Sequence, residues 1–127
     1  MSENGNLILL VDDEEDLVLA LKARFLAAGY EVEVARDGLE ALQKARSVEP
    51  EIIVLDVMLP KMDGFKICRL LKFDSRYSRI PIIMLSARGQ EIDRETGKKA
   101  GADEYMVKPF DSALLLQRIR ELIRSEQ

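Results

Sequence analysis

The chain has 127 residues, of which 47% are hydrophobic and 33% charged, and its net charge is −4 at pH 7. This length suits one globular domain, and the acidic balance argues against sequence-independent nucleic-acid binding, which needs a basic surface. No apolar run approaches the roughly 18 residues of a membrane span, and the polar start MSENGN is not typical of a signal peptide. The single Cys68 excludes an internal disulfide and fits a reducing compartment, so we expect a cytoplasmic protein.

The sequence contains no histidine. This absence excludes Ser-His-Asp and Cys-His nucleophiles, histidine-based zinc sites and imidazole acid–base catalysis within the chain. Any chemistry here must use carboxylates, hydroxyls, amines or a hard metal ion. A histidine that takes part in a reaction must come from another protein.

Strand-like and helix-like patterns alternate along the whole chain. The predicted strands, in chain order, are Leu7–Val11, Glu31–Ala35, Ile52–Asp56, Ile82–Ser86 and Glu104–Val107. The predicted helices, each following one strand, are Glu14–Ala28, Gly38–Arg46, Gly64–Phe73, Gln90–Lys99 and Ser112–Arg124. Because strands that alternate with helices form parallel sheets with right-handed crossovers, the pattern predicts one α/β domain over residues 1–127.

The composition of the strands predicts their order in the sheet. The first, third and fourth strands are continuous apolar runs, as expected for strands covered on both faces. The second strand alternates glutamate with valine, and the fifth is short and mixed, so both are predicted at sheet edges. This arrangement matches the flavodoxin-like order 2-1-3-4-5, in which ligands bind at the carboxyl ends of the first and third strands.

Polar residues stand at the carboxyl ends of four of these strands. Asp12 and Asp13 follow the first strand, Asp56 ends the third, Ser86 ends the fourth, and Lys108 follows the fifth. Two like charges about 4 Å apart repel by about 4 kcal/mol at an effective dielectric constant of 20, so three clustered carboxylates need cations beside them. Mg²⁺ prefers carboxylate, water and phosphate oxygens. The sequence therefore predicts a Mg²⁺ and phosphate site at this edge.

Asp56 is the predicted reacting group. The sequence contains neither a P-loop nor a GxGxxG fingerprint, so a bound nucleotide is poorly supported. A carboxylate can itself act as a nucleophile and form an aspartyl phosphate. Mg²⁺, Lys108 and the Ser86 hydroxyl would then position the phosphoryl oxygens and neutralise their charge. The acidic residues 14–16 are expected to form only a solvated first helical turn.

Four motifs resemble the receiver domains of two-component response regulators. They are VDDEED at Val11–Asp16, LDVMLPKMDG at Leu55–Gly64, LSARG at Leu85–Gly89 and GADEYMVKPF at Gly101–Phe110. The resemblance covers nearly the whole chain, in order and at the spacing of the family. It implies a signalling switch in which Asp56 takes a phosphoryl group from a phosphohistidine on a sensor histidine kinase or a histidine phosphotransfer protein.

The resemblance also implies roles for residues around Asp56. Asp12 and Asp13 match the acidic pair that holds Mg²⁺ in the family, directly or through water. Met58 matches a position whose backbone carbonyl also binds the metal. Lys108 is expected to contact the phosphoryl group, and its peptide bond to Pro109 is expected to be cis.

Two further residues match the switch positions of the family. Ser86 occupies the threonine or serine position, and Tyr105 occupies the aromatic position. On phosphorylation, the resemblance implies that the hydroxyl moves to a phosphoryl oxygen and that the ring turns inward, which changes the face formed by the fourth helix, fifth strand and fifth helix. Met58 and Arg88 stand at positions that vary in the family and tune the lifetime of the phosphoryl group.

The same face carries candidate residues for a phosphorylation-dependent homodimer. Glu104 and Arg118 are similar to one charged pair in the dimers of the family. Arg94 occupies another such position, but Leu114 stands where its acidic partner is usual.

The fourth helix is expected to differ from the others. Its charged run Glu91–Lys99 is typical of a solvated helix face. Gly97 lies inside the helix and costs about 1 kcal/mol relative to alanine, so we predict that this helix is mobile.

Two other functions remain as alternatives. One is an interaction module that uses the same fold without phosphorylation. The other is a phosphatase with an aspartate nucleophile, although Met58 interrupts the usual Asp-x-Asp pattern of such enzymes. The switch itself would catalyse only its own phosphorylation and slow dephosphorylation. The sequence leaves open whether the chain is a stand-alone regulator acting on a downstream partner or the receiver part of a longer protein with an output domain.

Overall fold

The computed structural model describes residues 6–87 and 91–125. One parallel sheet has the strand order β2-β1-β3-β4-β5. Its strands are β1 (Leu7–Val11), β2 (Glu31–Ala35), β3 (Ile52–Asp56), β4 (Ile82–Ser86) and β5 (Glu104–Val107). The helices are α1 (Glu15–Ala27), α2 (Gly38–Val48), α3 (Gly64–Lys72), α4 (Glu91–Lys99) and α5 (Ser112–Ser125). The predicted flavodoxin-like fold and strand order are confirmed.

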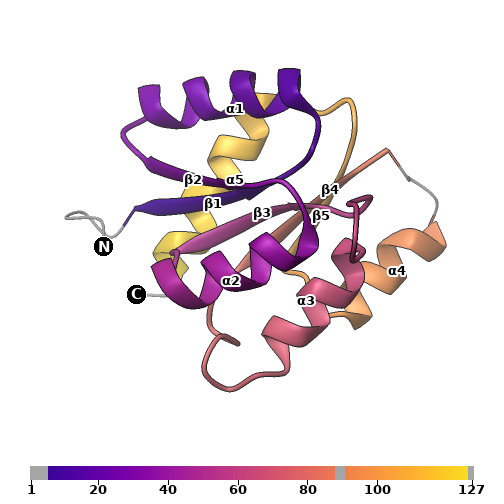
Figure 1. The fold of residues 1–127 in the computed structure, drawn as a ribbon. Helices are drawn as coiled ribbons and strands as arrows, with labels where there is room; N and C mark the ends of the chain where they lie inside the picture. Colours follow the sequence, from indigo (N-terminus) through magenta and orange to yellow (C-terminus); the bar gives the residue numbers. More distant parts are fainter. Residues whose placement is uncertain (1–5, 88–90, 126–127) are drawn as a thin grey trace.

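The helices cover both faces of the sheet, so the molecule has three layers. Figure 1 shows α1 and α5 on one face and α2, α3 and α4 on the other. Alternate residues of β1 point to opposite faces: Ile8 and Leu10 belong to the core under α1 and α5, whereas Leu9 and Val11 belong to the core under α2 and α3. This burial on both sides explains why the central strands are continuous apolar runs.

The helix ends differ from the predictions by no more than two residues. Helix α1 begins after Glu14, and Gly29 follows its end with a φ of 95°, a conformation that glycine adopts without strain. Helix α2 continues two residues past Arg46 to Val48 and is followed by Glu49, which has a φ of 47°. Gln90, the predicted start of the fourth helix, lies outside the described residues. Within the described ranges, no helix combines the length and the apolar character needed to cross a membrane.

Helix α4 is less solvated than its charged sequence predicts. The side chain of Asp93 is only 7% exposed, and Gly97 is also buried. A Cβ atom added to Gly97 would lie 2.9 Å from Cδ2 of Tyr105, which is closer than such atoms normally approach. The glycine therefore has a packing role, because it lets α4 approach the β5 strand closely.

The mobility of α4 remains a prediction, which hydrogen exchange measures directly. We expect the backbone amides of α4 to exchange faster than those of α1. Helix α1 buries three large apolar side chains, Val18, Leu21 and Phe25. Among the α4 side chains that the structure describes, the buried positions are only Asp93 and Gly97. The part of α4 from residue 93 to residue 99 thus buries little apolar surface, and such a segment opens at a low free-energy cost. Equal protection of the two helices would contradict this expectation.

Candidate functional site

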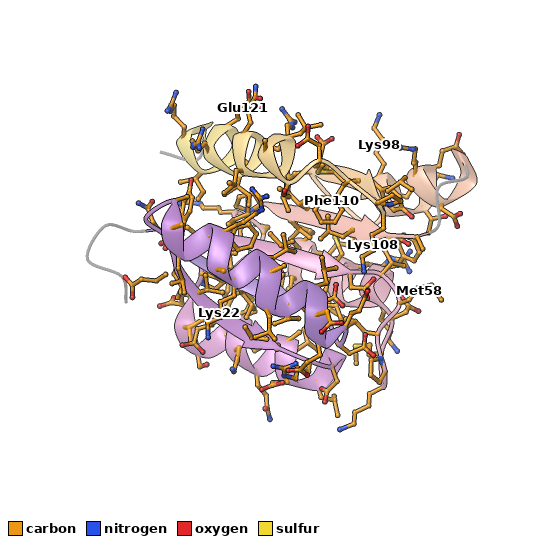
Figure 2. The ribbon with its side chains drawn as sticks, turned by 90° about the horizontal axis from the view of Figure 1, so that it is seen from above. Lys22, Met58, Lys98, Lys108, Phe110 and Glu121 are labelled. Atoms are coloured by element: carbon orange, nitrogen blue, oxygen red, sulfur yellow. The ribbon has the colours of Figure 1, made fainter. Side chains whose placement is uncertain are left out.

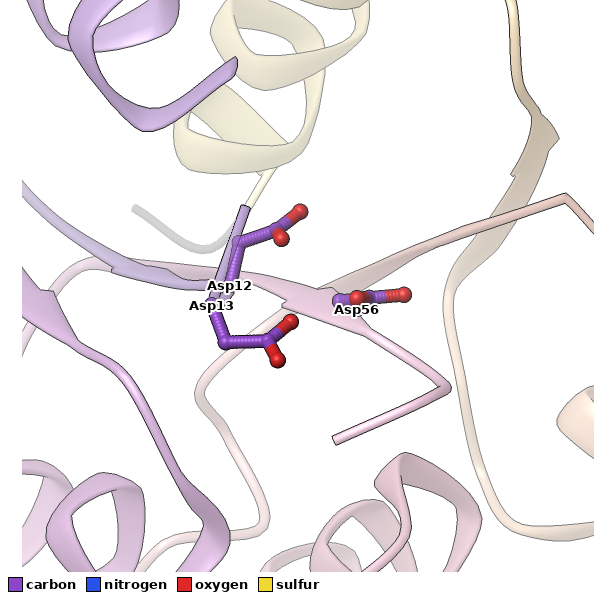
Figure 3. A group of neighbouring side chains, drawn as sticks. All are labelled: Asp12, Asp13 and Asp56. Atoms are coloured by element: carbon purple, nitrogen blue, oxygen red, sulfur yellow. The ribbon is translucent and has the colours of Figure 1, made fainter. Parts of the chain in front are cut away.

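Three carboxylates meet at the carboxyl edge of the sheet. Figure 3 shows Asp12 and Asp13 leaving the end of β1 beside Asp56, at the tip of β3, with all three side chains pointing to the same side. The two strands are hydrogen-bonded neighbours, with Val11 paired to Leu55. One carboxylate oxygen from each aspartate lies within 4.8 Å of the other two. Asp12 is fully buried and Asp56 is 6% exposed, whereas Asp13 is open to solvent.

Lys108 brings a positive charge to this cluster from the segment after β5. Its Nζ atom lies 3.2 Å from Oδ2 of Asp12 and 3.8 Å from Oδ2 of Asp56. Figure 2 shows Lys108 and Met58 at the same end of the molecule. The peptide bond between Lys108 and Pro109 is cis. The predicted lysine and the predicted aspartates are thus neighbours in space although 96 residues separate Asp12 from Lys108 in the chain.

Glu14 is a neighbour of this site that the sequence analysis assigned only to a solvated helical turn. Its side chain is 62% exposed, but its Oε1 atom accepts a hydrogen bond from Nζ of Lys108 at 3.3 Å. The backbone N–H of Glu14 also donates to Oδ1 of Asp12 at 2.9 Å. That interpretation was therefore incomplete. The signal for a role at the site was its position directly after the acidic pair.

The environment of Asp56 disfavours its negative charge. Burial and, next, the nearby carboxylate of Asp12 raise the pKa of Asp56 to about 6. The backbone N–H of Met58, 3.2 Å from Oδ1, and the ammonium of Lys108 oppose this shift. For Lys108, burial disfavours its charge, but the carboxylates of Asp12 and Asp56 outweigh burial, so its pKa is raised. The lysine stays positively charged, and Asp56 is largely ionised at pH 7.

The cluster opens into a shallow pocket that suits an oxygen-binding cation. A pocket of about 330 Å³ is lined by Asp13, Glu14, Asp56, Met58, Ala87 and Lys108. The three aspartates carry more negative charge than Lys108 neutralises, and their oxygens are the hard donors that Mg²⁺ prefers. The donor set therefore fits the predicted metal. The side chain of Met58 is 58% exposed at the rim of the pocket.

The two predicted switch residues lie in the strands next to the site. Ser86 is fully buried at the end of β4, and its backbone carbonyl accepts a hydrogen bond from the N–H of Lys108 at 2.7 Å. Tyr105 lies in β5 and is 8% exposed, with its ring on the side of the sheet that α4 covers. Arg88, predicted to tune phosphoryl lifetime, lies outside the described residues.

The residues of the predicted dimer face have partners within the chain. Nη2 of Arg118 lies 2.7 Å from Oε1 of Glu104, and Arg118 also pairs with Glu121. Nη1 of Arg94 donates to the backbone carbonyl of Tyr105 at 3.3 Å. Leu114 is 46% exposed on α5. The charged residues Arg94, Glu104 and Arg118 of the predicted dimer face thus all have partners within the chain.

Residues 8–120 match the family model of the response regulator receiver domain. The chain belongs to this family. The match covers β1 from Ile8, the other four strands, and the site residues from Asp12 to Lys108. Receiver domains are components of two-component signal transduction, so the predicted family is confirmed.

Full-length relatives of this receiver domain are longer proteins. This chain is 43% identical to the alkaline phosphatase synthesis transcriptional regulatory protein PhoP of Bacillus subtilis over 120 residues. The aligned region covers 94% of this chain and 49% of that protein. This chain is 44% identical over 117 residues to the response regulator PleD of Caulobacter vibrioides, covering 92% of this chain and 26% of that protein. The receiver domain thus spans about half, or less, of the length of these relatives.

A solved receiver structure has the same fold. The chemotaxis response regulator CheY4 of Vibrio cholerae superimposes with a TM-score of 0.85 and is 35% identical, with 92% of this chain and 98% of that chain covered. The five-stranded architecture is therefore that of a known single receiver domain.

The pKa of Asp56 leads to a prediction about stability. Because its folded-state pKa of about 6 exceeds the ordinary value of 3.8, the folded protein binds this proton more tightly than the unfolded chain does. The contribution of Asp56 to the stability of the folded protein should therefore fall as the pH rises from about 4 to 6. In the presence of a chelator, Asp56→Asn should raise the free energy of unfolding at pH 7 by up to about 3 kcal/mol.

Urea denaturation followed by circular dichroism measures this difference. The gain from Asp56→Asn should vanish below about pH 4, where the carboxyl is protonated in both states. Added Mg²⁺ should stabilise the wild type more than the variant, because the variant lacks one ligand. A gain that is independent of pH between 4 and 7 would contradict the electrostatic explanation.

Proposed function

We propose that this receiver domain is a phosphorylation-controlled switch and that Asp56 is its phosphoacceptor. One observation carries the proposal: the buried Asp56 carboxylate lies at the tip of a rigid strand, beside two aspartates and 3.8 Å from the ammonium of Lys108. Such a site combines a nucleophile with the charges that a transferred phosphoryl group requires. The family membership of the chain supports the same role.

The proposed reaction transfers a phosphoryl group from a donor histidine. A carboxylate oxygen of Asp56 attacks the phosphorus of a phosphohistidine, a P–O bond forms, and the P–N bond breaks. The leaving imidazole takes up a proton. Since these 127 residues contain no histidine, the donor histidine lies outside them, and a sensor histidine kinase or a histidine phosphotransfer protein is the proposed donor. Water later hydrolyses the acyl phosphate, which releases inorganic phosphate and restores the carboxylate.

Lys108 and the acidic pair would support this reaction in different ways. Lys108 already contacts Asp12 and approaches Asp56, so a phosphoryl group on Asp56 would lie within reach of its ammonium. Asp12, Asp13 and the backbone carbonyl of Met58 would hold Mg²⁺, together with Asp56. When bound, Mg²⁺ would neutralise the carboxylates and the phosphoryl oxygens. With the metal bound, the side chains at the strand ends would be placed for transfer of the phosphoryl group to Asp56.

The output would be a change in the α4-β5-α5 face. Ser86 and Tyr105 lie on neighbouring strands, with Met84 paired to Tyr105 and Ser86 paired to Val107. A phosphoryl oxygen that attracts the Ser86 hydroxyl would alter the space beside the Tyr105 ring and so the position of α4. A downstream partner or an output domain would then bind this face in one of its two states.

The cytosolic location inferred from Cys68 also stays a prediction.

Mass measurement of the intact protein tests the proposed function. After incubation with Mg²⁺ and acetyl phosphate, the wild type should gain about 80 Da, which corresponds to one phosphoryl group. Asp56→Asn should abolish the adduct because the nucleophile is lost. Lys108→Ala should slow its formation by at least about tenfold, because a charge that stabilises the transferred group is lost.

Glu15→Gln is the matched control for these variants. Glu15 lies in the first turn of α1 near the site, but its exposed carboxylate pairs with Arg36 rather than with Lys108. Glu15→Gln should leave the rate of adduct formation unchanged. An adduct that persists in Asp56→Asn would refute the assignment of the acceptor. No adduct in the wild type would favour an interaction module that works without phosphorylation, and turnover of a phosphomonoester would favour a phosphatase.

We also propose that phosphorylation promotes homodimers through the α4-β5-α5 face. Such a dimer would require Arg118 to exchange its intrachain partner Glu104 for the same residue of a second copy. Sedimentation velocity should therefore show a dimer that forms with acetyl phosphate and weakens as salt rises. Arg118→Glu should abolish the dimer, and the double variant Glu104→Arg with Arg118→Glu should restore it. A sedimentation coefficient unchanged by phosphorylation would contradict this proposal.

A further inference from the structure

The ring of Tyr105 lies in a socket formed by α4 and the neighbouring strand. Gly97 of α4 and Met84 of β4 pack beside the ring, and the guanidinium of Arg94 lies over it, 5.6 Å from its centroid. The ring is consequently almost removed from solvent, since Tyr105 is only 8% exposed. Two of these three residues come from one helix, so the ring and the position of α4 depend on each other.

Gly97 provides the space that the ring occupies. A Cβ atom at this position would lie 2.9 Å from Cδ2 of Tyr105 and 3.2 Å from Sδ of Met84. Because the ring is the nearer of the two and Met84 is fully buried, the ring is the group that would have to shift most. The glycine, which lowers helix propensity, thus stands at a point where any side chain would collide with Tyr105. The stability that α4 loses by having a glycine here is therefore the cost of keeping the ring in its inward position.

Arg94 holds the same tyrosine by two separate contacts. Its guanidinium lies within the distance at which a cation is attracted to the face of an aromatic ring. Its Nη1 atom also donates a hydrogen bond to the backbone carbonyl of Tyr105 at 3.3 Å. Strand β5 is at the edge of the sheet, where alternate carbonyls lack a neighbouring strand. One solvent-exposed side chain therefore fastens both the ring and the backbone of Tyr105 to α4.

We propose that Arg94 and Gly97 are positioning residues that hold Tyr105 in its inward orientation. Gly97 makes room for the ring, and Arg94 closes the socket from the solvent side. Arg94 thus acts within its own chain, where the residue expected to pair with it across a dimer is replaced by Leu114. The inference rests on the proposed function only in taking Tyr105 as the switch. The socket itself can be tested without phosphorylation.

Nitration by tetranitromethane, followed by peptide mass mapping, reports how accessible each tyrosine ring is. The chain has three tyrosines, and Tyr30 is buried in the opposite core, so it serves as an internal reference. Without a phosphodonor, Arg94→Met should raise the nitration rate of Tyr105 by about fivefold and leave that of Tyr30 unchanged. Arg94→Lys should restore most of the protection, since an ammonium can also stand over the ring. Gly97→Ala should expose Tyr105 at least as strongly as Arg94→Met.

A second arginine–tyrosine pair provides a matched control. The guanidinium of Arg76 lies 5.2 Å from the centroid of the Tyr77 ring, far along the chain from the site. Arg76→Met should change the nitration of Tyr77 and not that of Tyr105. Wild-type reactivity of Tyr105 in Arg94→Met and in Gly97→Ala would overturn the proposal. So would an equal rise at all three tyrosines, which would indicate a general loosening of the fold.

A second arm connects the socket to the switch. With Mg²⁺ and acetyl phosphate, wild type and Arg94→Met should both acquire the phosphoryl mass, because Arg94 does not touch the acceptor. Phosphorylation should then lower the nitration rate of Tyr105 further in the wild type. In Arg94→Met the decrease should be less than half as large. An equal response would show that Arg94 plays no part in the switch. Absence of the adduct in the wild type would refute the proposed function, while the comparison without phosphodonor would still decide the socket.

Discussion

The crowding of three carboxylates around one ammonium is the constraint on which this structure depends. Asp12, Asp13 and Asp56 place oxygens within 4.8 Å of one another, and Lys108 lies against two of these aspartates. The repulsion is visible in the raised pKa of Asp56, to which burial and the carboxylate of Asp12 both contribute. A single lysine cannot neutralise this charge, so added positive charge would stabilise the site. In the proposed function, a bound cation would offset this imbalance and leave the Asp56 oxygen available as a nucleophile.

The central strands withstand this repulsion because both of their faces are buried. Every residue of β1, β3 and β4 is buried, so their ends cannot move apart without exposing core side chains. The charge cluster is therefore held by the hydrophobic packing of the strands that lead to it. Tyr105 and α4 differ in this respect, since they lie at the edge of the sheet and are joined through Gly97 and Arg94. If α4 is as mobile as we predict, a firmly packed site would lie beside a movable edge, which suits the proposed switch.

Most of the fold could be predicted because the relevant signals are local. All five strands were predicted with the bounds that the structure has, since apolar runs ending in polar residues mark buried strands clearly. What the sequence did not predict were the contact made by one charged residue and the burial of another. Glu14 and Asp93 were both assigned to solvated helix faces, but Glu14 contacts Lys108 and Asp93 is 7% exposed. The sequence shows the charge of such residues, whereas their burial depends on elements distant in the chain.

The sequence by itself determined the strand order, the edge where the site forms and the residues that gather there. It did so because parallel strands place their carboxyl ends together, whatever the details of side-chain packing. Only the tertiary structure decided that Glu14 shares Lys108 with Asp12, that Arg118 pairs with Glu104 in its own chain, and that Arg94 covers Tyr105. The tertiary structure also explains Gly97. Helix propensity alone marks this glycine as destabilising to α4, whereas the packing shows that it makes room for the Tyr105 ring. These contacts depend on distances of a few ångströms between segments far apart in sequence, which no local pattern records.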